Sequence, residues 1–185
     1  MMYPLQHVKL VGLHNIENIM AALAVCHVFS LKSSDIQKGL ESFVGLEHRL
    51  EWVREYNGVS YYNDSKATNV HAVVMSLQGF ADHCVFLILG GRDKGGSYNP
   101  LKSWVRKKGK RLYLIGEARE KIHRELGDLV PTVCVETIGA ALTDIQSYNV
   151  KGDCVLLSPA CSSYDQFNNY EERGRYFKEQ VWQLH

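Results

Sequence analysis

The sequence predicts an α/β fold in which a doubly wound, mostly parallel sheet carries helices on both faces and follows a short helical segment. Three observations indicate this class. Apolar runs of strand length alternate with helix-like stretches beyond residue 80. Runs that are apolar throughout are typical of strands covered on both faces, as in parallel sheets. Upstream, the turn pair Asn57-Gly58 marks a hairpin, and the first 45 residues contain only helical patterns.

The N-terminal segment is predicted to be a pair of helices. From Asn15 to about Leu31, apolar residues recur at three- and four-residue intervals, and Asn15 is placed to cap the first turn. A second helix is expected from about residue 34 to about residue 44. This pair has no sheet to pack on, so we expect residues 1–45 and residues 46–185 to belong to different domains.

Strands and helices alternate through the second domain. Two strands are predicted on either side of the hairpin turn, within residues 50–64. Further strands are expected at Val85–Leu89, Leu112–Ile115, Val130–Val135 and Val155–Leu157. Helices are expected at about Asn69–Leu77, Leu101–Lys107, Ala118–Leu126, Ile138–Ser147 and Asp165–Gln183. Ligands of open parallel sheets bind beyond the carboxyl ends of the strands, so the loops that follow the strands are where a site is expected.

Composition argues against several classes of protein. The 21 basic and 20 acidic residues give a formal net charge of +1, which supplies no broad field for nucleic acid or an anionic membrane. The five cysteines are odd in number and widely spaced, so neither a disulfide framework nor a cysteine metal site is predicted. No stretch approaches the roughly 20 apolar residues that span a bilayer. We expect a cytoplasmic protein, monomeric, that binds small molecules and neither nucleic acid nor membrane.

Three polar loops are expected at the carboxyl edge of the sheet. The run from Asn63 to Asn69 holds a carboxylate, an ammonium and two hydroxyls, although helix capping would also explain it. The run from Leu89 to Gly96 has four glycines around two cations, which lets backbone N–H groups and Lys94 approach an anion, and a flexible turn is the alternative. The run from Leu157 to Phe167 ends a strand in small hydroxylated residues where a helix is expected to begin, which suits a carboxylate.

Residue types and spacing alone predict a binding site for an anionic small molecule, and they do not identify that molecule. The Gly-rich run lacks the GxxxxGK[ST] spacing of a phosphate loop. Cys161 and Ser163 have no His base near them in sequence, and a small buried cysteine is common as packing, so neither is expected to be a nucleophile. A lone histidine such as His48 is more often structural than catalytic, and an arginine placed as Arg49 is more often a surface charge than a phosphate ligand.

The combination of motifs resembles the Mur ligase family. The resemblance is carried by Gly12-Leu13-His14-Asn15 with Asn18, Gly45–Glu51, Asn63–Asn69, Gly90-Gly91 with Lys94, Leu157–Phe167 and Arg173-Gly174. The first two are shared with the folylpolyglutamate synthases and mark the superfamily. The Asp-Ser-Lys-Ala-Thr-Asn and Ser-Pro-Ala-Cys runs are typical of the family member that adds D-glutamate. The Asn-Pro-Arg loop of the relatives that add diaminopimelate or lysine is missing.

The resemblance implies an ATP-dependent ligase of peptidoglycan precursor synthesis, which joins D-glutamate to UDP-N-acetylmuramoyl-L-alanine through an acyl phosphate. Residues 46–185 would be its Rossmann-like C-terminal domain, and residues 1–45 the last helices of its central ATPase domain. ATP and Mg²⁺ are the implied cofactors. The phosphate loop and metal ligands are expected upstream of Met1, with no metal ligand inside this chain. The chain is therefore not expected to catalyse ligation alone.

The resemblance also implies a catalytic residue and an ATP site. Lys66 matches a lysine near the reacting phosphoryl group. Asn15 and Asn18 match positions near the adenine and the nucleotide. Arg49 matches a phosphate contact and Asp64 a ribose contact. Domain closure would bring these groups together, with the Gly45 to His48 region as the expected hinge.

Four further positions match contacts with D-glutamate, namely Thr68, Lys94, Ser163 and Tyr170. Tyr170 stands where phenylalanine is expected. A contact made by its backbone N–H would survive this difference, whereas a contact that depends on side-chain packing would not.

Other interpretations stay open. A different Mur ligase or a folylpolyglutamate synthase would change the substrate and keep the fold. A non-catalytic nucleotide- or amino-acid-binding module would bind its ligand tightly without a partner domain. A dinucleotide-dependent oxidoreductase is disfavoured because no GxGxxG motif follows a strand with an acidic residue about 20 positions later.

Overall fold

A computed structural model describes residues 2–6, 8 and 13–185, with residues 13 and 14 described by their backbone alone. Gly12 of the first motif lies outside this part of the chain. The chain divides into two compact units, Met1–Leu46 and Glu47–His185. Among the described residues, no helix combines the length and apolar character that crossing a bilayer requires.

The first unit contains the two predicted helices, α1 (Leu13–Val28) and α2 (Ser33–Ser42). Helix α1 begins two residues before Asn15, so the prediction that Asn15 caps it is wrong. The Asn15 Oδ1 instead accepts a hydrogen bond from Asn18 Nδ2 at 3.5 Å along the helix. Helix α1 also ends before Leu31, because Ser30 adopts a left-handed conformation (φ 53°) and Leu31 N donates to Cys26 O at 3.0 Å.

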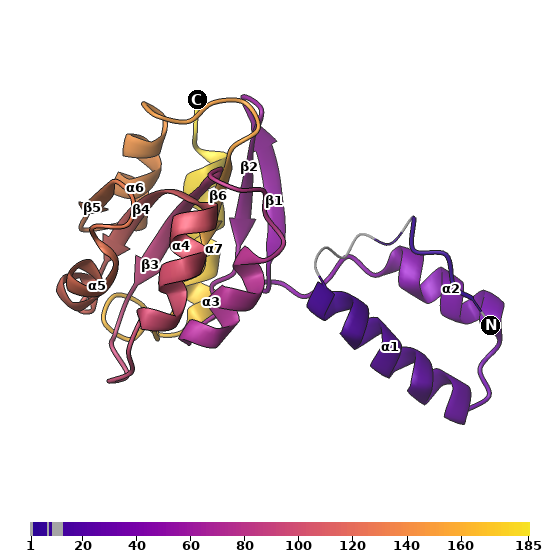
Figure 1. Cartoon of the computed structure of the whole chain (residues 1–185). Coiled ribbons are helices and arrows are strands. Elements are labelled where there is room, and N and C mark those ends of the chain that lie inside the picture. The colour runs from indigo at the N-terminus through magenta and orange to yellow at the C-terminus, as the bar shows by residue number, and fades with distance from the viewer. Residues whose placement is uncertain (1, 7, 9–12) are drawn as a thin grey trace. The chain divides into compact units, whose positions relative to one another are not determined.

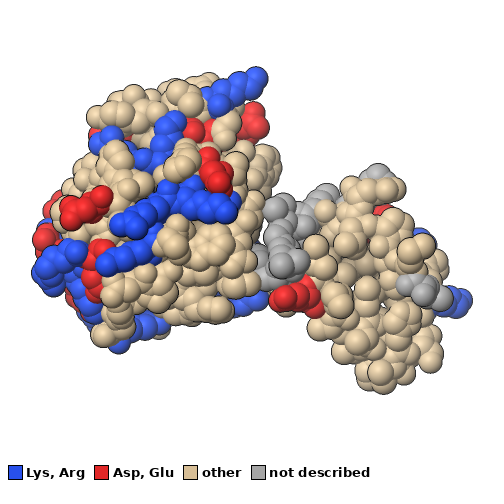
Figure 2. Space-filling model, viewed as in Figure 1, with Lys and Arg blue, Asp and Glu red and all other residues tan. Residues whose placement is uncertain are grey.

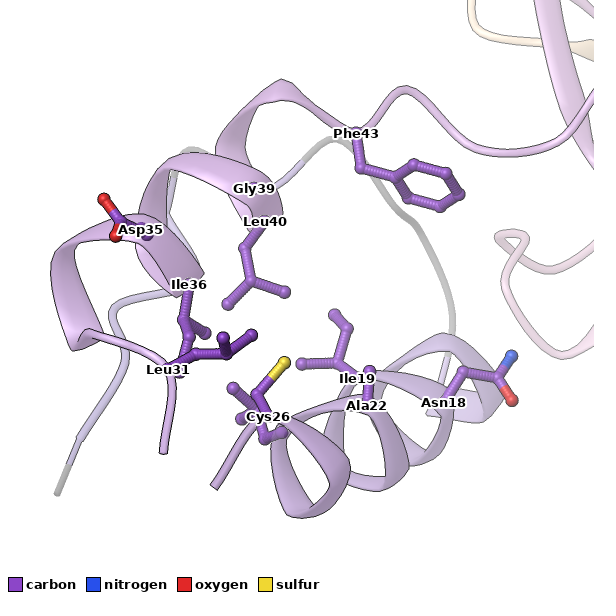
Figure 3. A pocket seen from close by; sticks show the side chains of 11 residues that line it. Asn18, Ile19, Ala22, Cys26, Leu31, Asp35, Ile36, Gly39, Leu40 and Phe43 are labelled. Atoms are coloured by element: carbon purple, nitrogen blue, oxygen red, sulfur yellow. The ribbon is translucent and has the colours of Figure 1, made fainter. Parts of the chain in front are cut away.

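An apolar groove of about 500 Å³ lies between these two helices (Figure 3). Ile19 and Ile36 are buried in the described unit, while other large apolar side chains on α1 and the following turn, such as Met20 and Phe29, remain exposed. Two short helices have too little surface to cover each other fully. The helical pair thus leaves much of its apolar surface open.

The second unit is built on a six-stranded sheet with the order β1-β2-β6-β3-β4-β5 (Figure 1). The strands are β1 (Glu51–Tyr56), β2 (Val59–Asn63), β3 (Val85–Gly90), β4 (Gly109–Ile115), β5 (Thr132–Cys134) and β6 (Cys154–Leu157). Strands β1 and β2 form the predicted antiparallel hairpin, and every other pair in the sheet is parallel. The prediction of a mostly parallel α/β sheet is confirmed.

Helices cover both faces of this sheet. One face carries α3 (Val70–Leu77), the 3₁₀ turn η1 (Asn99–Leu101), α4 (Lys102–Lys108) and α5 (Arg119–Leu126), and the other carries α6 (Ile138–Ile145) and α7 (Tyr170–Trp182). In β3, Leu87 packs on the first side and Phe86 and Ile88 on the second, as the pleat requires. Figure 2 shows Lys and Arg side chains gathered over α4, which ends in three basic residues.

Two predicted boundaries are corrected. The last helix begins at Tyr170 and not near Asp165, because Asn169 caps it by accepting a hydrogen bond from Glu172 N at 2.7 Å. Asp165 instead accepts a bond from Glu117 N, which follows β4. The fifth strand begins after Pro131 rather than at Val130, since proline has no N–H to donate to a ladder.

Candidate functional site

The three polar loops meet at the carboxyl edge of the sheet. Strands β2, β6 and β3 are neighbours, so the loops that follow them lie side by side. Backbone hydrogen bonds join the loops: Ala160 N donates to Ala67 O, Gly90 N to Pro159 O and Arg92 N to Ser162 O, each at 2.9 Å. The three runs of sequence therefore form one continuous rim.

Glycine is required where the second loop leaves β3. Gly90 and Gly91 have φ angles of 123° and 131°, in the region that side chains rarely adopt. A Cβ atom at Gly90 would overlap the carbonyl oxygen of Ile115, and one at Gly91 would overlap that of Ser162. The pair lets the loop pass closely between its neighbours and turn back over the sheet edge.

Lys66 and Tyr170 lie together on this rim. Lys66 is exposed, and its Nζ lies 5.4 Å from the centre of the Tyr170 ring. Ser65 Oγ donates to Tyr170 O at 2.7 Å, which fixes the start of α7 beside the first loop. Tyr170 is the first residue of α7, where backbone N–H groups have no carbonyl partner within the helix. The Lys66 ammonium therefore lies beside the first turn of α7, and a cation in this place suits an anion.

Lys94 and Thr68 form a second pair. The exposed Lys94 Nζ donates to Thr68 O at 2.9 Å, which joins the Gly-rich loop to the first loop. Ser163 lies on the third loop but is only 2% exposed, and its carbonyl accepts a hydrogen bond from Phe167 N at 2.8 Å. The Lys94 ammonium is therefore exposed on the rim, whereas Ser163 is buried beneath it.

Asp64 points inward. Its Oδ1 accepts from Leu50 N at 3.0 Å, and its Oδ2 accepts from Ser76 Oγ at 2.6 Å and Ser158 Oγ at 2.7 Å. The residue is only 3% exposed. This carboxylate joins the first loop to α3, to the third loop just after β6 and to the turn before β1. It leaves little surface for the predicted ribose contact.

Arg49 extends from a tight turn that precedes β1. Its neighbours His48 and Leu50 both have positive φ angles, 66° and 44°. The Arg49 side chain is exposed and forms no ion pair with any residue that the structure describes. A free guanidinium in this position suits the predicted phosphate contact. Asn15 and Asn18, the other predicted ATP contacts, lie on α1 in the first unit.

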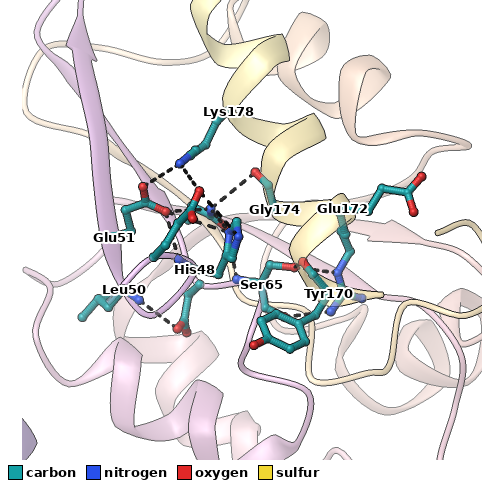
Figure 4. A network of polar contacts seen from close by, with 12 residues as sticks. His48, Leu50, Glu51, Ser65, Tyr170, Glu172, Gly174 and Lys178 are labelled. Carbon is teal, nitrogen blue, oxygen red and sulfur yellow. Dashed lines mark hydrogen bonds and ion pairs between the residues drawn. The ribbon is translucent and has the colours of Figure 1, made fainter. Parts of the chain in front are cut away.

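His48 holds that turn in place through a polar network (Figure 4). Asn63 Nδ2 donates to His48 Nδ1 at 2.9 Å, while Asn63 Oδ1 accepts from Ser65 N at 3.2 Å, so the amide orientation is fixed. The Nε2 atom of His48 therefore carries the proton of the neutral ring. Burial lowers the pKa of His48, against the opposing effect of Glu47 and Glu51.

The same network contains three groups with metal-ligand chemistry. Ligand atoms of Glu47, His48 and Glu51 lie within 4.8 Å of one another. Lys178 Nζ, however, donates to Glu47 Oε1 at 2.7 Å and to Glu51 Oε1 at 2.8 Å. The carboxylate charges are already paired with an ammonium from α7, so this cluster fits a structural ion network better than a metal centre.

Arg173 is a residue of this edge to which sequence reasoning gave no role. It is 1% exposed and donates to Ser65 Oγ and Ser65 O, each at 2.9 Å, and to Cys161 O at 3.1 Å. Burial lowers its pKa to about 10, so it remains charged at neutral pH. The guanidinium fastens the first and third loops together. The Arg-Gly pair at the end of the motif set was the only sequence signal for it.

The family profile described as "Mur ligase, glutamate ligase domain" matches residues 48–161, which is more than half of the chain. The chain belongs to the Mur ligase family. The match includes the first two polar loops in full and the third as far as Cys161. It confirms the resemblance that the motifs indicated.

Relatives of this Mur ligase chain share its sequence over most of its length. It is 46% identical over 183 residues to a protein of Bdellovibrio bacteriovorus and 50% identical over 173 residues to one of Geotalea daltonii, both named UDP-N-acetylmuramoylalanine--D-glutamate ligase. The alignments cover 99% and 94% of this chain but only 39% and 38% of the relatives. The chain thus spans about two fifths of the length of these relatives.

Solved structures show the same fold. The UDP-N-acetylmuramate-alanine ligase of Thermotoga maritima matches with a TM-score of 0.69 at 15% identity, over 95% of this chain and 39% of that one. The folylpolyglutamate synthase of Mycobacterium tuberculosis matches with a TM-score of 0.67 at 16% identity, over 92% and 41%. At such low identity the likeness concerns the fold alone.

Proposed function

We propose that this chain is the amino-acid-binding C-terminal part of a ligase that uses ATP to join D-glutamate to UDP-N-acetylmuramoyl-L-alanine. The observation that carries the proposal is the identity of 46–50% over 94–99% of the chain to proteins named for that ligation. Residues 1–45 are assigned to the end of a central ATPase domain. The substrates are small molecules, and we propose a cytoplasmic monomer that requires neither nucleic acid nor membrane.

The rim of the sheet suits the binding of D-glutamate, the amino acid that accepts the acyl group in this reaction. ATP would phosphorylate the alanine carboxylate, and the amine of D-glutamate would attack the acyl phosphate, releasing phosphate. D-glutamate brings two carboxylates, for which Lys94, Thr68 and the backbone N–H of Tyr170 are proposed contacts. Ser163 completes this proposed set, with its side chain buried in the structure. Holding the amine near the acyl phosphate while balancing negative charge is the main task of such a site.

The exposed cations suit the step in which the phosphoryl group of ATP is transferred. Lys66 is free to approach the transferring phosphoryl group, and its backbone is fixed because Lys66 N donates to His48 O at 3.0 Å. Arg49, on the same turn as His48, is the proposed contact to the nucleotide phosphates, together with Asn15 and Asn18 for the adenine side. Asp64 completes this proposed set, with its carboxylate turned inward in the structure.

Mg²⁺ is the proposed metal, and it would neutralise charge on the phosphates. The cluster of Glu47, His48 and Glu51 does not fit it, since Lys178 already binds both carboxylates. The metal ligands are therefore proposed to lie outside this chain. Within the chain, Lys66 and Arg49 are the groups that would contact the phosphates beside it.

Phosphate release tests the proposal. The full-length protein is incubated with ATP, Mg²⁺ and UDP-N-acetylmuramoyl-L-alanine, and with D-glutamate, L-glutamate or diaminopimelate as acceptor. The present chain alone serves as the control. We expect release only with D-glutamate and none from the chain alone. Preference for another acceptor would refute the substrate assignment, and turnover by the chain alone would refute the assignment of the ATPase to another part of the protein.

A further inference from the structure

Lys94 sits in a loop that gives it little support of its own. It is exposed, and the two residues after it, Gly95 and Gly96, are exposed glycines, the first with a φ angle of 83°. A flexible lysine on a glycine-rich loop loses much entropy when it binds a carboxylate. A well-defined contact at Lys94 therefore requires that the loop be anchored by other residues.

Asp93 supplies such an anchor next to Lys94. Its Oδ1 accepts a hydrogen bond from the Tyr98 hydroxyl at 3.0 Å, and its Oδ2 accepts one from Lys121 Nζ at 2.9 Å. The same Lys121 Nζ donates to Gly96 O at 2.7 Å. Residues on both sides of Lys94 are thus fixed to α5 and to the end of the loop.

The anchor continues into the third loop. Tyr98 is 3% exposed, and its hydroxyl lies 3.0 Å from Cys161 Sγ. The hydrogen bond from Lys121 lowers the pKa of Asp93, and burial raises the pKa of Cys161, so the first is a carboxylate and the second a thiol at neutral pH. A carboxylate only accepts, so Tyr98 donates to Asp93, and the thiol donates to the Tyr98 oxygen.

This order of donors makes one directed chain of hydrogen bonds, from Cys161 through Tyr98 to Asp93, with Lys121 closing it. Cys161 lies two residues before Ser163, and Asp93 lies one residue before Lys94. These hydrogen bonds therefore link the two loops that carry the proposed carboxylate contacts. It also gives Cys161 a role in which its thiol is a donor and not a nucleophile.

We propose that Asp93 is a positioning residue for the amino-acid substrate, because its hydrogen bonds to Tyr98 and Lys121 fix Lys94 relative to Ser163. The inference rests on the proposed function, since it names D-glutamate as the ligand of these two loops. Asp93 itself is not proposed to touch the substrate. It acts through the geometry of the loop, so its loss is expected to weaken acceptor binding and to spare ATP.

The chain contains a matched control for Asp93. Asp144 on α6 accepts a hydrogen bond from the Tyr113 hydroxyl at 2.7 Å and lies 3.7 Å from the Arg111 guanidinium. It is partly exposed, as Asp93 is, and it also joins a buried tyrosine to a cation. It packs on the other face of the sheet, away from the three loops. Asp93→Asn and Asp144→Asn therefore remove the same charge from similar surroundings.

Two measurements on these variants test the proposal. In this chain, backbone hydrogen exchange at residues 94–97 is expected to quicken in Asp93→Asn and to stay unchanged in Asp144→Asn. In the full-length protein, Asp93→Asn is expected to raise the KM for D-glutamate by about tenfold, the worth of one charged hydrogen bond, without changing the KM for ATP. Tyr98→Phe removes the hydroxyl that joins Asp93 to Cys161 without altering charge, and it is expected to act in the same direction.

The outcomes separate this inference from the proposed function. A wild-type protein that does not use D-glutamate overturns both. If the wild type uses D-glutamate, an unchanged KM for D-glutamate in both Asp93→Asn and Tyr98→Phe overturns the positioning role, whatever the exchange rates. Equal increases of the KM values for D-glutamate and ATP in Asp93→Asn also overturn it, since they indicate general damage to the protein. An equal increase of the KM for D-glutamate in Asp144→Asn overturns it for the same reason.

Discussion

Arg173 shows what one buried charge does at the edge of the sheet. Desolvation of a guanidinium is costly, and among the described residues Arg173 has no ion pair to offset that cost. Its hydrogen bonds to Ser65 and Cys161 offset part of that cost, while its buried Nη1 atom has no hydrogen-bond partner among the described residues. Because these two residues belong to different loops, the stability of the rim depends on the side chain.

Arg173→Met is expected to lower the free energy of unfolding by about 2 to 3 kcal/mol, because the carbonyls of Ser65 and Cys161 lose their donor in a buried place. Arg173→Lys keeps the charge with fewer, differently directed donors, so it should lie between the wild type and the Met variant. Denaturant unfolding of the sheet unit measures both. Wild-type stability in Arg173→Met would show that the interior tolerates the loss of these bonds.

His48 makes stability depend on pH in a defined direction. Burial lowers its pKa from 6.5 in the folded protein, with Lys178 and Arg175 acting in the same sense and Glu47 and Glu51 acting against them. The unfolded chain therefore binds more protons than the folded chain as the pH falls below about 6.5. The contribution of neutral His48 to stability is present above that pH and is lost as the pH falls through the lowered pKa.

Replacing His48 by asparagine should remove this part of the pH dependence. Asparagine tolerates the φ angle of 66° better than most residues, which limits strain from the change. Thermal unfolding between pH 8 and pH 5, values that bracket the ordinary histidine pKa of about 6.5, gives the slope for each protein. We expect a shallower fall in stability at acid pH for His48→Asn. Equal slopes would mean that His48 does not titrate differently in the folded state.

The elements themselves were largely predictable from local signals. Runs such as 85–89 are apolar throughout, and Asn69 caps α3 by accepting a hydrogen bond from Ala72 N at 2.9 Å, the type of signal that sequence reading uses. The start of α7 was not predictable in this way. Asp165 resembles a helix cap in sequence, but its bond to Glu117 N depends on a residue 48 positions away.

Helix α7 also illustrates a packing requirement that local propensity contradicts. Alanine is normally preferred over glycine within a helix by about 1 kcal/mol. A Cβ at Gly174, however, would overlap the ring of His48, which is held by Asn63 and cannot move freely. Glycine allows the helix to approach the turn that carries Arg49.

Gly174→Ala is therefore expected to destabilise the protein by about 1 to 3 kcal/mol, the usual cost of overpacking a rigid site. Gly139→Ala in α6 is the matched control. A Cβ there would lie 2.8 Å from Oε1 at the end of the flexible Gln180 side chain and at an ordinary contact distance of 3.5 Å from the Tyr176 hydroxyl. Thermal unfolding of both variants decides the point. A Gly174→Ala protein as stable as Gly139→Ala would contradict the close packing of His48 on α7.

For the whole molecule, topology explains why the candidate site could be found from sequence. Parallel strands end at one edge, so polar runs after β2, β3 and β6 had to converge. Which side chains face a ligand could not be predicted. Asp64 turns inward because Leu50, Ser76 and Ser158 supply donors from distant parts of the chain. The role of Arg173 likewise depends on contacts 108 residues apart in sequence.

This sheet edge is proposed to bind the acceptor amino acid of a ligase. Measuring the KM values for D-glutamate and ATP in full-length Lys94→Met is the most direct test, with Lys107→Met as the control. Lys107 is an exposed lysine in the last turn of α4, and its carbonyl accepts a hydrogen bond from His83 N, which precedes β3 at the opposite edge of the sheet. We expect Lys94→Met to raise the KM for D-glutamate by at least about tenfold, as loss of a charged hydrogen bond implies, and to leave the KM for ATP unchanged. An unchanged KM for D-glutamate in an active Lys94→Met protein would show that the acceptor binds elsewhere.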